Sequence, residues 1–264
     1  MPQFSILIVT LNAEKSIIKT VNSVICQTCN DYELIVKDGF SNDNTVSLIQ
    51  KDTKIKIIQM KDSGIYDAMN QASKIANGNY LCFLNAGDEF YSPYVLEDIK
   101  KVITNDDSQC MIYYGDYYKN GVAIKQPEKL TKFSLFRNQL NHQSMFFSHE
   151  LFIKEDTYNT EYHILADYDL TVRTFFSGML IKHIHIIIDK YEGNGISESK
   201  NGIILYKNEN NAIRKKYYKR KYYIYLIIFR ISMPGIRRTL ASKKMPLFIR
   251  KAYRKISNWI NSSL

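Results

Sequence analysis

The chain has 264 residues, of which 45% are hydrophobic and 13% aromatic, and this composition excludes a disordered, collagenous or disulfide-rich protein. The net charge of +10 is unevenly distributed, because residues 1–209 carry 21 basic and 26 acidic side chains, whereas residues 210–264 carry 15 basic side chains and no acid. The sequence therefore indicates a mildly acidic globular body followed by a cationic tail.

Strands alternate with helices in the first ninety residues. Short apolar, β-branched runs predict the strands, and apolar residues at helical spacing predict the helices between them. The expected order is strand 4–10, helix 17–25, strand 32–37, helix 43–51, strand 55–59, helix 65–76 and strand 80–84. This alternation favours a parallel sheet with right-handed crossovers, in which ligands bind at the carboxyl ends of the strands.

After residue 90 the alternation becomes less regular. The expected elements are helix 93–104, strands 109–114 and 117–125 that turn at Gly115-Asp116, strand 143–148, helix 167–176 and strand 180–188. They predict a mixed α+β region that closes the sheet. Glycines and serines between residues 193 and 202 mark a boundary, which we place between a body of residues 1–202 and a tail of residues 203–264.

Polar residues cluster where four of the predicted strands end. The clusters are Thr10-Leu11-Asn12, Asp38-Gly39, Asp62-Ser63-Gly64 and Asn85-Ala86-Gly87-Asp88. Neither the glycine-rich dinucleotide fingerprint nor the phosphate-binding P-loop motif is present in the sequence. A nucleotide bound beside these carboxylates would need a metal ion or side chains to hold its phosphates.

Five ordered motifs resemble those of glycosyltransferase family 2, the inverting enzymes with a GT-A fold. They are IVTLN (8–12), VKDGFSNDNT (36–45), DSGIYDAMNQA (62–72), GNYLCFLNAGDEF (78–90) and ADYDLTVR (166–173). The resemblance covers roughly residues 3–200 and implies an α/β fold. In that fold, a Rossmann-like nucleotide-sugar-binding half (1–90) is continued by a mixed α+β acceptor half (91–202). The basic tail (203–264) lies beyond the resemblance, and its large apolar residues on helical repeats predict that it is helical.

The resemblance also implies a set of donor contacts. These residues are Thr10, Leu11, Asn12, Asp38, Asp62, Asp67, Asn70, Asn85 and Ala86. Asp38 would accept a hydrogen bond from the base, since uracil offers an N–H donor, although an Asp before a Gly is also an ordinary turn residue. Asp67 and Asn70 share a helical face, and a solvated helix face is the alternative interpretation for them.

Residues 85–88, with the sequence NAGD, lie where the family carries its D-x-D-type metal motif. The resemblance therefore implies that Asp88 holds a divalent cation, Mn²⁺ or Mg²⁺, against the diphosphate of the donor. Asn85 replaces the first carboxylate of the motif. Its amide oxygen can ligate a hard cation or bind the ribose, but it brings no charge.

An inverting transfer needs a carboxylate that takes the proton of the attacking acceptor hydroxyl. Residues 166–169, with the sequence ADYD, resemble the family's E-D-x-D pattern, with Ala166 in place of Glu. Asp167 then matches the catalytic base. A simple acid at a helix N-terminus is the alternative interpretation of Asp167.

Three further residues are candidates for acceptor or phosphate contacts. His142, in the polar triplet Asn141-His142-Gln143, could bind the acceptor, the diphosphate or the metal, or it could be a structural histidine. Asp169 would brace the start of its helix or pair with Arg173. Arg173 could instead reach a phosphate.

The tail interleaves basic residues with large apolar ones between residues 213 and 259. Its longest uncharged run, Tyr222–Phe229, has eight residues, whereas about twenty are needed to span a bilayer, so we expect no transmembrane helix. An amphipathic segment on an anionic membrane surface fits this pattern. RNA or DNA binding is the alternative, which the aliphatic residues Ile224–Ile228 and Leu247–Ile249 disfavour.

The sequence thus predicts a hexosyl- or N-acetylhexosaminyltransferase that uses a nucleotide-sugar donor, and we expect this donor to be a UDP-sugar. The expected acceptor is a hydroxyl of a lipid-linked saccharide in bacterial surface-polysaccharide or lipopolysaccharide synthesis. No signal peptide is recognisable in the first residues, so we expect a cytoplasmic enzyme on the inner face of the membrane, with no nucleic-acid partner. The alternatives are a catalytically silent scaffold, suggested by Asn85 and Ala166, and a nucleic-acid-binding protein.

Overall fold

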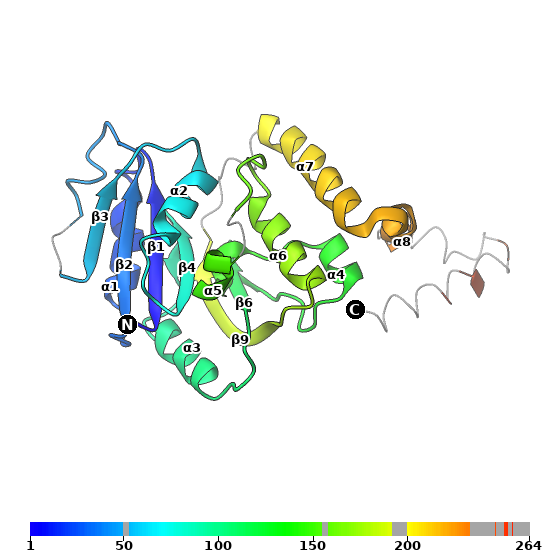
Figure 1. Cartoon of the computed structure of the whole chain (residues 1–264), viewed down its shortest axis with the longest axis horizontal. Helices are drawn as coiled ribbons and strands as arrows, with labels where there is room; N and C mark the ends of the chain where they lie inside the picture. Colours follow the sequence, from blue (N-terminus) through cyan, green and yellow to red (C-terminus); the bar gives the residue numbers. More distant parts are fainter. Residues whose placement is uncertain are drawn as a thin grey trace. The chain divides into compact units, whose positions relative to one another are not determined.

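The contacts within the chain divide it into two compact units. The computed structural model describes residues 1–49, 53–154, 158–191 and 200–232, with positions 246, 251, 252 and 255 (Figure 1). Unit 1 comprises Met1–Glu128 and Leu140–Glu209, and unit 2 comprises Lys129–Gln139 and Asn210–Leu264. Unit 2 therefore combines an internal segment of the body with the tail.

A nine-stranded mixed sheet forms the centre of unit 1, in the order β3-β2-β1-β4-β8-β6-β9-β5, with β7 paired to β6. The strands are β1 (Phe4–Thr10), β2 (Tyr32–Asp38), β3 (Ile55–Gln59), β4 (Tyr80–Asn85), β5 (Glu89–Phe90), β6 (Ile112–Lys119), β7 (Val122–Ile124), β8 (Met145–Ser148) and β9 (Ile181–Lys190). The first four are parallel to one another, whereas β8 runs antiparallel to both β4 and β6. The parallel part confirms the prediction from strand–helix alternation.

Helices cover both faces of the parallel strands. Unit 1 contains α1 (Ile17–Ile25), α2 (Ile65–Ser73), α3 (Val95–Thr104), α5 (His149–Lys154), α6 (Ala166–Phe176) and the first part of α7 (Lys200–Tyr218). The buried residues of α1 and α3 form one hydrophobic cluster with alternate residues of β1, namely Phe4, Ile6 and Ile8. Helix α2 packs against β1 and β2 without contributing to that cluster, so it covers the opposite face (Figure 1).

The hairpin after residue 110 turns at a different place from the one predicted. Strand β6 continues through Gly115-Asp116, and the turn is at Asn120-Gly121, whose φ angles of 51° and 81° are those of a type I′ turn. Gly115 has another role. A Cβ there would lie 2.4 Å from the carbonyl oxygen of Ile186, so glycine permits the close approach of β9 beside a register shift.

The predicted helix 43–51 is replaced by turns as far as residue 49, and its last two residues lie outside the described part of the chain. Asp43 explains this difference. Its carboxylate accepts hydrogen bonds from the backbone N–H of Thr45 at 3.0 Å and of Glu14 at 3.1 Å, together with the Thr45 hydroxyl. Such local bonds compete with the bonds of a helix.

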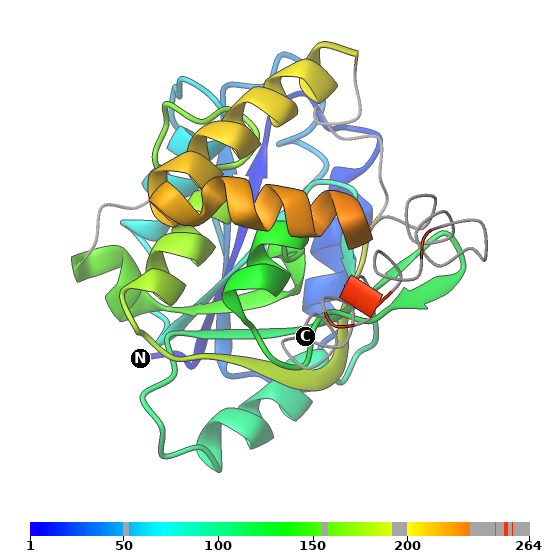
Figure 2. The same cartoon turned by 90° about the vertical axis from the view of Figure 1, so that its right-hand side faces the viewer.

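Unit 2 is helical where it is described. It contains α4 (Lys132–Arg137), the end of α7 (Lys200–Tyr218), the 3-10 turn η3 (Lys219–Lys221) and α8 (Tyr222–Ser232). The chain bends sharply between α7 and α8, and Lys219 at this bend has a φ of 46° (Figure 2). No helix among the described residues is long and apolar enough to cross a membrane.

The side chain of Phe136 on α4 holds unit 2 together. Its ring centroid lies 5.0 to 6.4 Å from those of four aromatic residues of the tail, namely Tyr218, Tyr222, Tyr225 and Phe229. The Arg214 guanidinium lies 4.5 Å from the same ring, and the Tyr218 hydroxyl donates to the Lys132 carbonyl at 2.6 Å. The tail therefore packs on a segment that precedes it by about 80 residues.

Candidate active site

The carboxyl ends of the parallel strands bring the predicted donor contacts together. Thr10 at the end of β1 is in register with Asp38 at the end of β2, and Val9 is in register with Asn85 at the end of β4. The expectation that polar strand ends share one edge is therefore confirmed. The hydroxyl oxygen of Thr10 is buried and has no hydrogen-bond partner among the described residues, so it can still bind a ligand.

Asp38 is fully buried and organises the loop that follows it. Its carboxylate accepts hydrogen bonds from Ser41, through the backbone N–H at 2.8 Å and the hydroxyl, and from Gln59 Nε2 at 3.1 Å. In the facing loop, Leu11 is exposed, and Asn12, with a φ of 52°, accepts from the backbone N–H of Asn42 at 2.9 Å. These side-chain bonds give the loop edge a fixed shape.

Asp62 lies beside this edge, because its carboxylate pairs with the ammonium of Lys37, whose side chain is fully buried. It also accepts from the backbone N–H of Gly64 at 3.2 Å. A Cβ at Gly39 would lie 2.9 Å from Asp62 Oδ2, so the two predicted loops touch.

Asp67 and Asn70, both on α2, make structural hydrogen bonds. Asp67 accepts from Ser63, through its N–H at 2.8 Å and its hydroxyl at 2.9 Å, and these bonds lower the pKa of the Asp67 carboxyl. The Asn70 amide donates to the Tyr158 carbonyl and accepts from the Tyr158 N–H, both at 2.9 Å. The Asn70 side chain is thus engaged with the backbone of a distant loop.

The NAGD segment forms a turn that places Asp88 next to the strand ends. The Asp88 N–H donates to the Asn85 carbonyl at 3.0 Å, Ala86 and Asp88 form a bridge, and Gly87 has a φ of 113°. The Asp88 carboxylate is buried and accepts from Gln143 Nε2 at 2.9 Å. The Asn85 amide oxygen is buried and accepts no hydrogen bond from the described residues.

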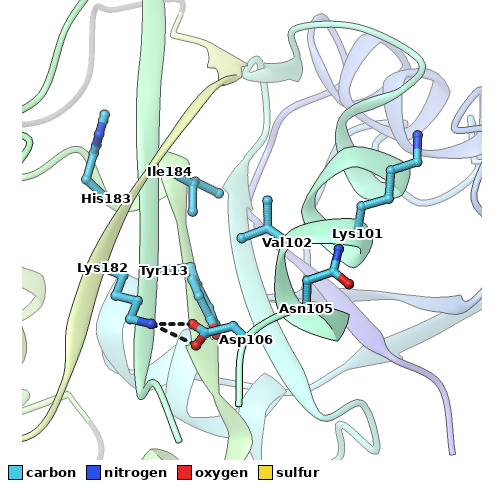
Figure 3. A pocket seen from close by; sticks show the side chains of 8 residues that line it. All are labelled: Lys101, Val102, Asn105, Asp106, Tyr113, Lys182, His183 and Ile184. Carbon is cyan, nitrogen blue, oxygen red and sulfur yellow. Dashed lines mark hydrogen bonds and ion pairs between the residues drawn. The ribbon is translucent and has the colours of Figure 1, made fainter. Parts of the chain in front are cut away.

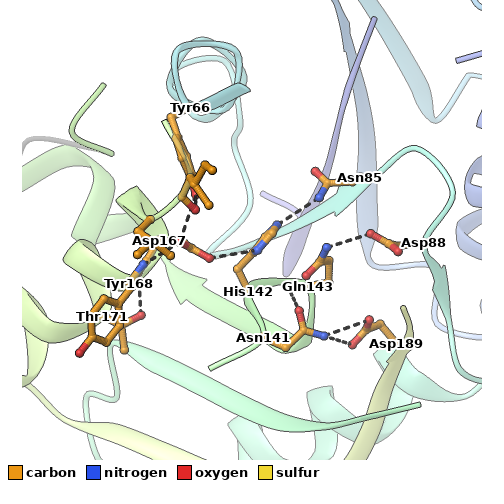
Figure 4. Close-up of polar contacts among 12 residues, drawn as sticks. Tyr66, Asn85, Asp88, Asn141, His142, Gln143, Asp167, Tyr168, Thr171 and Asp189 are labelled. Carbon is orange, nitrogen blue, oxygen red and sulfur yellow. Dashed lines mark hydrogen bonds and ion pairs between the residues drawn. The ribbon is translucent and has the colours of Figure 1, made fainter. Parts of the chain in front are cut away.

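Asp167, the second residue of α6, lies in a network with residues from two other elements (Figure 4). One carboxylate oxygen accepts from the Tyr66 hydroxyl at 3.1 Å and from the Tyr168 N–H at 2.8 Å, and the other lies 3.2 Å from His142 Nδ1. The side chains of Asp167 and His142 are each 16% exposed. This pair is therefore partly accessible to solvent.

His142 connects Asp167 to the donor side, because its Nε2 lies 3.3 Å from the Asn85 amide nitrogen. Burial alone would lower the pKa of His142, but its hydrogen bond to Asp167 and the charges of Asp167, Asp88 and Asp189 raise this pKa above its usual value of 6.5. In the neutral ring, the Asn85 amide donates to Nε2 and the ring proton on Nδ1 is directed at Asp167.

Asp169 and Arg173 lie away from Asp167 on the same helix. Asp169 follows Asp167 by two residues, which is about 200° around the helix axis, whereas Asp169 and Arg173 are four residues apart on one face. Asp169 is buried. The helix therefore directs Asp167 alone of these three toward His142.

Sequence reasoning did not identify two residues of this cluster, Tyr66 and Asp189. Asp189 is fully buried near the end of β9, accepts from the Asn141 amide at 3.3 Å and from the Ser144 hydroxyl, and has its pKa raised to about 7, chiefly by burial. An acid that directly follows the apolar run Ile186–Ile188 was the available signal. Tyr66 lies within a recognised motif, but its partner Asp167 is 101 residues away.

A cavity of about 490 Å³ lies elsewhere in unit 1, between α3, β6 and β9 (Figure 3). Lys182 and Asp106 form an ion pair at its wall, with N–O distances of 2.7 and 2.8 Å. No predicted site residue lines this cavity. The candidate site is therefore the cluster of strand ends, NAGD turn and Asp167 network.

Two curated relatives are similar to this chain in sequence. The PGL/p-HBAD biosynthesis glycosyltransferase of Mycobacterium tuberculosis is 31% identical over 210 residues, which cover 75% of this chain and 80% of the relative. The Escherichia coli enzyme WfaP, a UDP-Glc:alpha-D-GlcNAc-diphosphoundecaprenol beta-1,3-glucosyltransferase, is 32% identical over 121 residues, 45% of this chain and 47% of WfaP.

Two solved structures share the fold. S. aureus TarS 1-349 in complex with UDP-GlcNAc superposes with a TM-score of 0.69 at 18% identity, covering all of this chain and 82% of that one. The mannosyltransferase PcManGT from Pyrobaculum calidifontis, in complex with GDP-Man and Mn²⁺, gives a TM-score of 0.66 at 14% identity, with coverages of 98% and 80%. These likenesses confirm the predicted GT-A architecture with a helical C-terminal region.

The family model of Glycosyl transferase family 2 matches residues 5–163, which is more than half of the chain. This match and the 31% identical relative bear out the resemblance that the five motifs indicated. The enzyme is thereby favoured over the silent scaffold. The chain belongs to glycosyltransferase family 2 and is a glycosyltransferase.

Proposed function

We propose that this glycosyltransferase transfers a sugar, with inversion, from a UDP-sugar to a hydroxyl of a lipid-linked saccharide in bacterial surface-glycan synthesis. The observation that carries this proposal is the pairing of two carboxylates in one cluster. Asp88 lies at the strand ends where a donor diphosphate would bind, and Asp167 lies beyond His142 with its side chain accessible.

In such a transfer, the acceptor oxygen attacks the anomeric carbon as the bond from that carbon to the UDP oxygen breaks. Asp167 would take the proton of the acceptor hydroxyl, and its carboxylate has lone pairs left for this beyond its bonds to Tyr66, Tyr168 and His142. The Tyr66 and His142 contacts fix the orientation of the carboxylate. Asp167 is thus proposed as the general base.

The residues of the NAGD turn fit a divalent cation. Asp88 supplies a buried carboxylate, and the Asn85 amide oxygen is a buried acceptor that the described residues leave unused. Mg²⁺ or Mn²⁺ bound at the phosphates of a substrate commonly takes only one or two protein carboxylates. When bound, the cation would offset the charge of the departing diphosphate, and Asp88 and Asn85 would hold it.

Proteins that are similar to this chain in structure or sequence support the choice of donor and acceptor. TarS was solved with UDP-GlcNAc, and WfaP is named for a UDP-glucose donor and a diphosphoundecaprenol-linked acceptor. In this chain, the proposed nucleoside contacts are Thr10, Leu11, Asn12 and Asp38.

Turnover of a panel of UDP- and GDP-sugars, with and without Mn²⁺, tests the proposal. Hydrolysis of GDP-sugars alone would contradict the UDP assignment.

We further propose that unit 2 attaches the enzyme to the cytoplasmic face of an anionic membrane. Its two segments, residues 129–139 and 210–264, contain 18 Lys and Arg residues and no acid. Each basic residue near an anionic bilayer contributes about 1 kcal/mol of attraction. Because unit 2 has no acid of its own, the balancing negative charge must come from outside it.

Helix α8 supplies an apolar surface that the packing of unit 2 leaves uncovered. Tyr222, Tyr225 and Phe229 face Phe136, whereas Ile224 and Ile227 on the other side are each 57% exposed. Exposed aliphatic side chains beside cations are typical of helices that lie in a membrane interface. Nucleic acid would not favour them.

Cosedimentation with vesicles tests this attachment. The double variant Ile224→Ser/Ile227→Ser should pellet less with phosphatidylglycerol vesicles than the wild type, while still binding UDP. The matched control Ile203→Ser/Ile204→Ser alters exposed aliphatic residues of α7 that belong to unit 1 and should pellet normally. Protein that ignores the vesicles but shifts RNA in a gel would support the nucleic-acid alternative instead.

A further inference from the structure

One short turn contacts three carboxylates of the candidate site. It consists of the 3-10 turn η1 (His142–Ser144) and its N-cap residue Asn141. Its contacts, in chain order, are Asn141 to Asp189, His142 to Asp167, Gln143 to Asp88 and Ser144 to Asp189. Figure 4 shows the first three of them. The two middle residues therefore bind the proposed base and the proposed cation ligand, and the two outer residues bind a third acid.

Asp189 holds the turn at both ends. The Asn141 amide lies 3.3 Å from each of its carboxylate oxygens, and the Ser144 hydroxyl donates to one of them. Asp189 is fully buried, so water could not replace either hydrogen bond to its carboxylate if that bond were lost. This carboxylate is therefore a rigid anchor for the residues between Asn141 and Ser144.

The same acid is connected to Asp88 by a second route. Asp189 is in register with Phe90 in the antiparallel pairing of β9 with β5, and β5 begins at Glu89, directly after Asp88. Asp189 is thus connected to Asp88, on the donor side of the site, both through the turn and through the pairing of β9 with β5.

We propose that Asp189 is a positioning residue, which fixes the turn at residues 141–144 and thereby the placement of Asp167 relative to Asp88. This inference rests on the proposed function, in which Asp167 is the base. A displacement of about 1 Å between reacting groups can lower a rate by about a hundredfold, so an anchor of this kind affects turnover without touching the substrate.

The variant Asp189→Asn tests the proposal, because it keeps the shape of the side chain but presents an N–H group to the Asn141 amide. With a UDP-sugar that the wild type hydrolyses, kcat should fall by about tenfold or more, while KM for that sugar and the Kd for UDP stay unchanged. Asp106→Asn is the matched control, since Asp106 is an ion-paired acid at the separate cavity, and its kcat should equal that of the wild type.

A measurement that needs no turnover gives the same information. The ¹⁵N resonances of the His142 ring report its contact with Asp167, so they should move in Asp189→Asn toward their positions in Asp167→Asn. Ser144→Ala removes one of the two hydrogen-bond donors to Asp189, so it should shift the His142 resonances in the same direction by a smaller amount. This variant replaces Asp189→Asn in the test if Asp189→Asn does not fold. Unchanged His142 signals, or a loss of kcat that only follows the unfolded fraction, would overturn the proposal.

The test separates this inference from the proposed function. If Asp167→Asn retains turnover, the assignment of the base fails. If Asp167→Asn is inactive while Asp189→Asn has normal kcat and normal His142 signals, only the positioning role of Asp189 fails.

Discussion

The strand-end loops of the first ninety residues and the turn at residues 141–144 hold their carboxylates in different ways. In the loops, Asp38 and Asp67 each bind a serine three or four residues away, Ser41 and Ser63, although the loops also contain longer contacts such as Asp62 with Lys37. At the turn, every partner is distant, and the Gln143–Asp88 bond joins residues 55 positions apart. Local bonds shape individual loops, whereas distant bonds set the spacing between parts of the site.

This difference predicts two kinds of mutational effect. Changes at acids that bind the turn should alter the chemical step or cation binding, because they shift groups that must act together. Changes at residues whose bonds do not involve the turn should alter loop conformation or the free energy of unfolding.

Replacement of Asp167 by Asn should lower kcat by roughly a hundredfold or more, the usual contribution of a general base, without weakening UDP binding. Single-turnover kinetics with the active donor measures this change. Asp169→Asn on the same helix is the comparison variant. Equal losses in the two variants would show that the helix, and not the Asp167 carboxylate, is responsible.

The Asp88→Ala variant should bind UDP in the presence of Mn²⁺ more than about tenfold more weakly than the wild type, because Asp88 supplies the only carboxylate in the NAGD turn. Calorimetric titration with and without Mn²⁺ gives both dissociation constants. Binding of UDP without Mn²⁺ should be nearly unchanged. The assignment is wrong if Asp88→Ala responds to Mn²⁺ as the wild type does.

For Asn70→Ala, we expect a loss of stability, since two hydrogen bonds to the Tyr158 backbone disappear and leave buried partners unsatisfied. The free energy of unfolding should fall by about 2 kcal/mol or more, as measured by urea denaturation. Gln71→Ala, on the next residue of α2, removes an exposed bond to the Lys61 carbonyl and should cost far less. A parallel loss of UDP affinity in Asn70→Ala would instead support a direct donor contact.

The smallest expected effect concerns the pH dependence of stability at Asp106, remote from the site. Burial opposes ionisation there, but the bonds from Lys182, Ser108 and Tyr113 hold the pKa of this carboxyl well below its usual 3.8. The lowered pKa contributes stability that is present above pH 3.8 and is lost as the pH falls below it. Urea denaturation from pH 5 to pH 3 should therefore show a shallower decline for Asp106→Asn than for the wild type.

The sequence anticipated much of the parallel half of the fold. Apolar runs such as Phe4–Thr10 and Tyr80–Leu84 form strands because their burial does not depend on details of distant packing. The strand ends then converge by register, so Thr10, Asp38 and Asn85 could be expected at one edge. Local turns were predicted less well: Asp43 forms a turn where a helix was expected, and the hairpin turns at Asn120-Gly121 instead of Gly115-Asp116.

What the sequence alone determined, then, is the alternation of elements, the edge at which polar residues gather and the absence of acids from the tail. Each of these follows from periodicity or composition within short windows. The tertiary structure decided which distant side chains meet: Tyr66 with Asp167, the turn at residues 141–144 with Asp189, and Phe136 with the tail. Such contacts depend on the packing of separate elements, and no local pattern of residues encodes them.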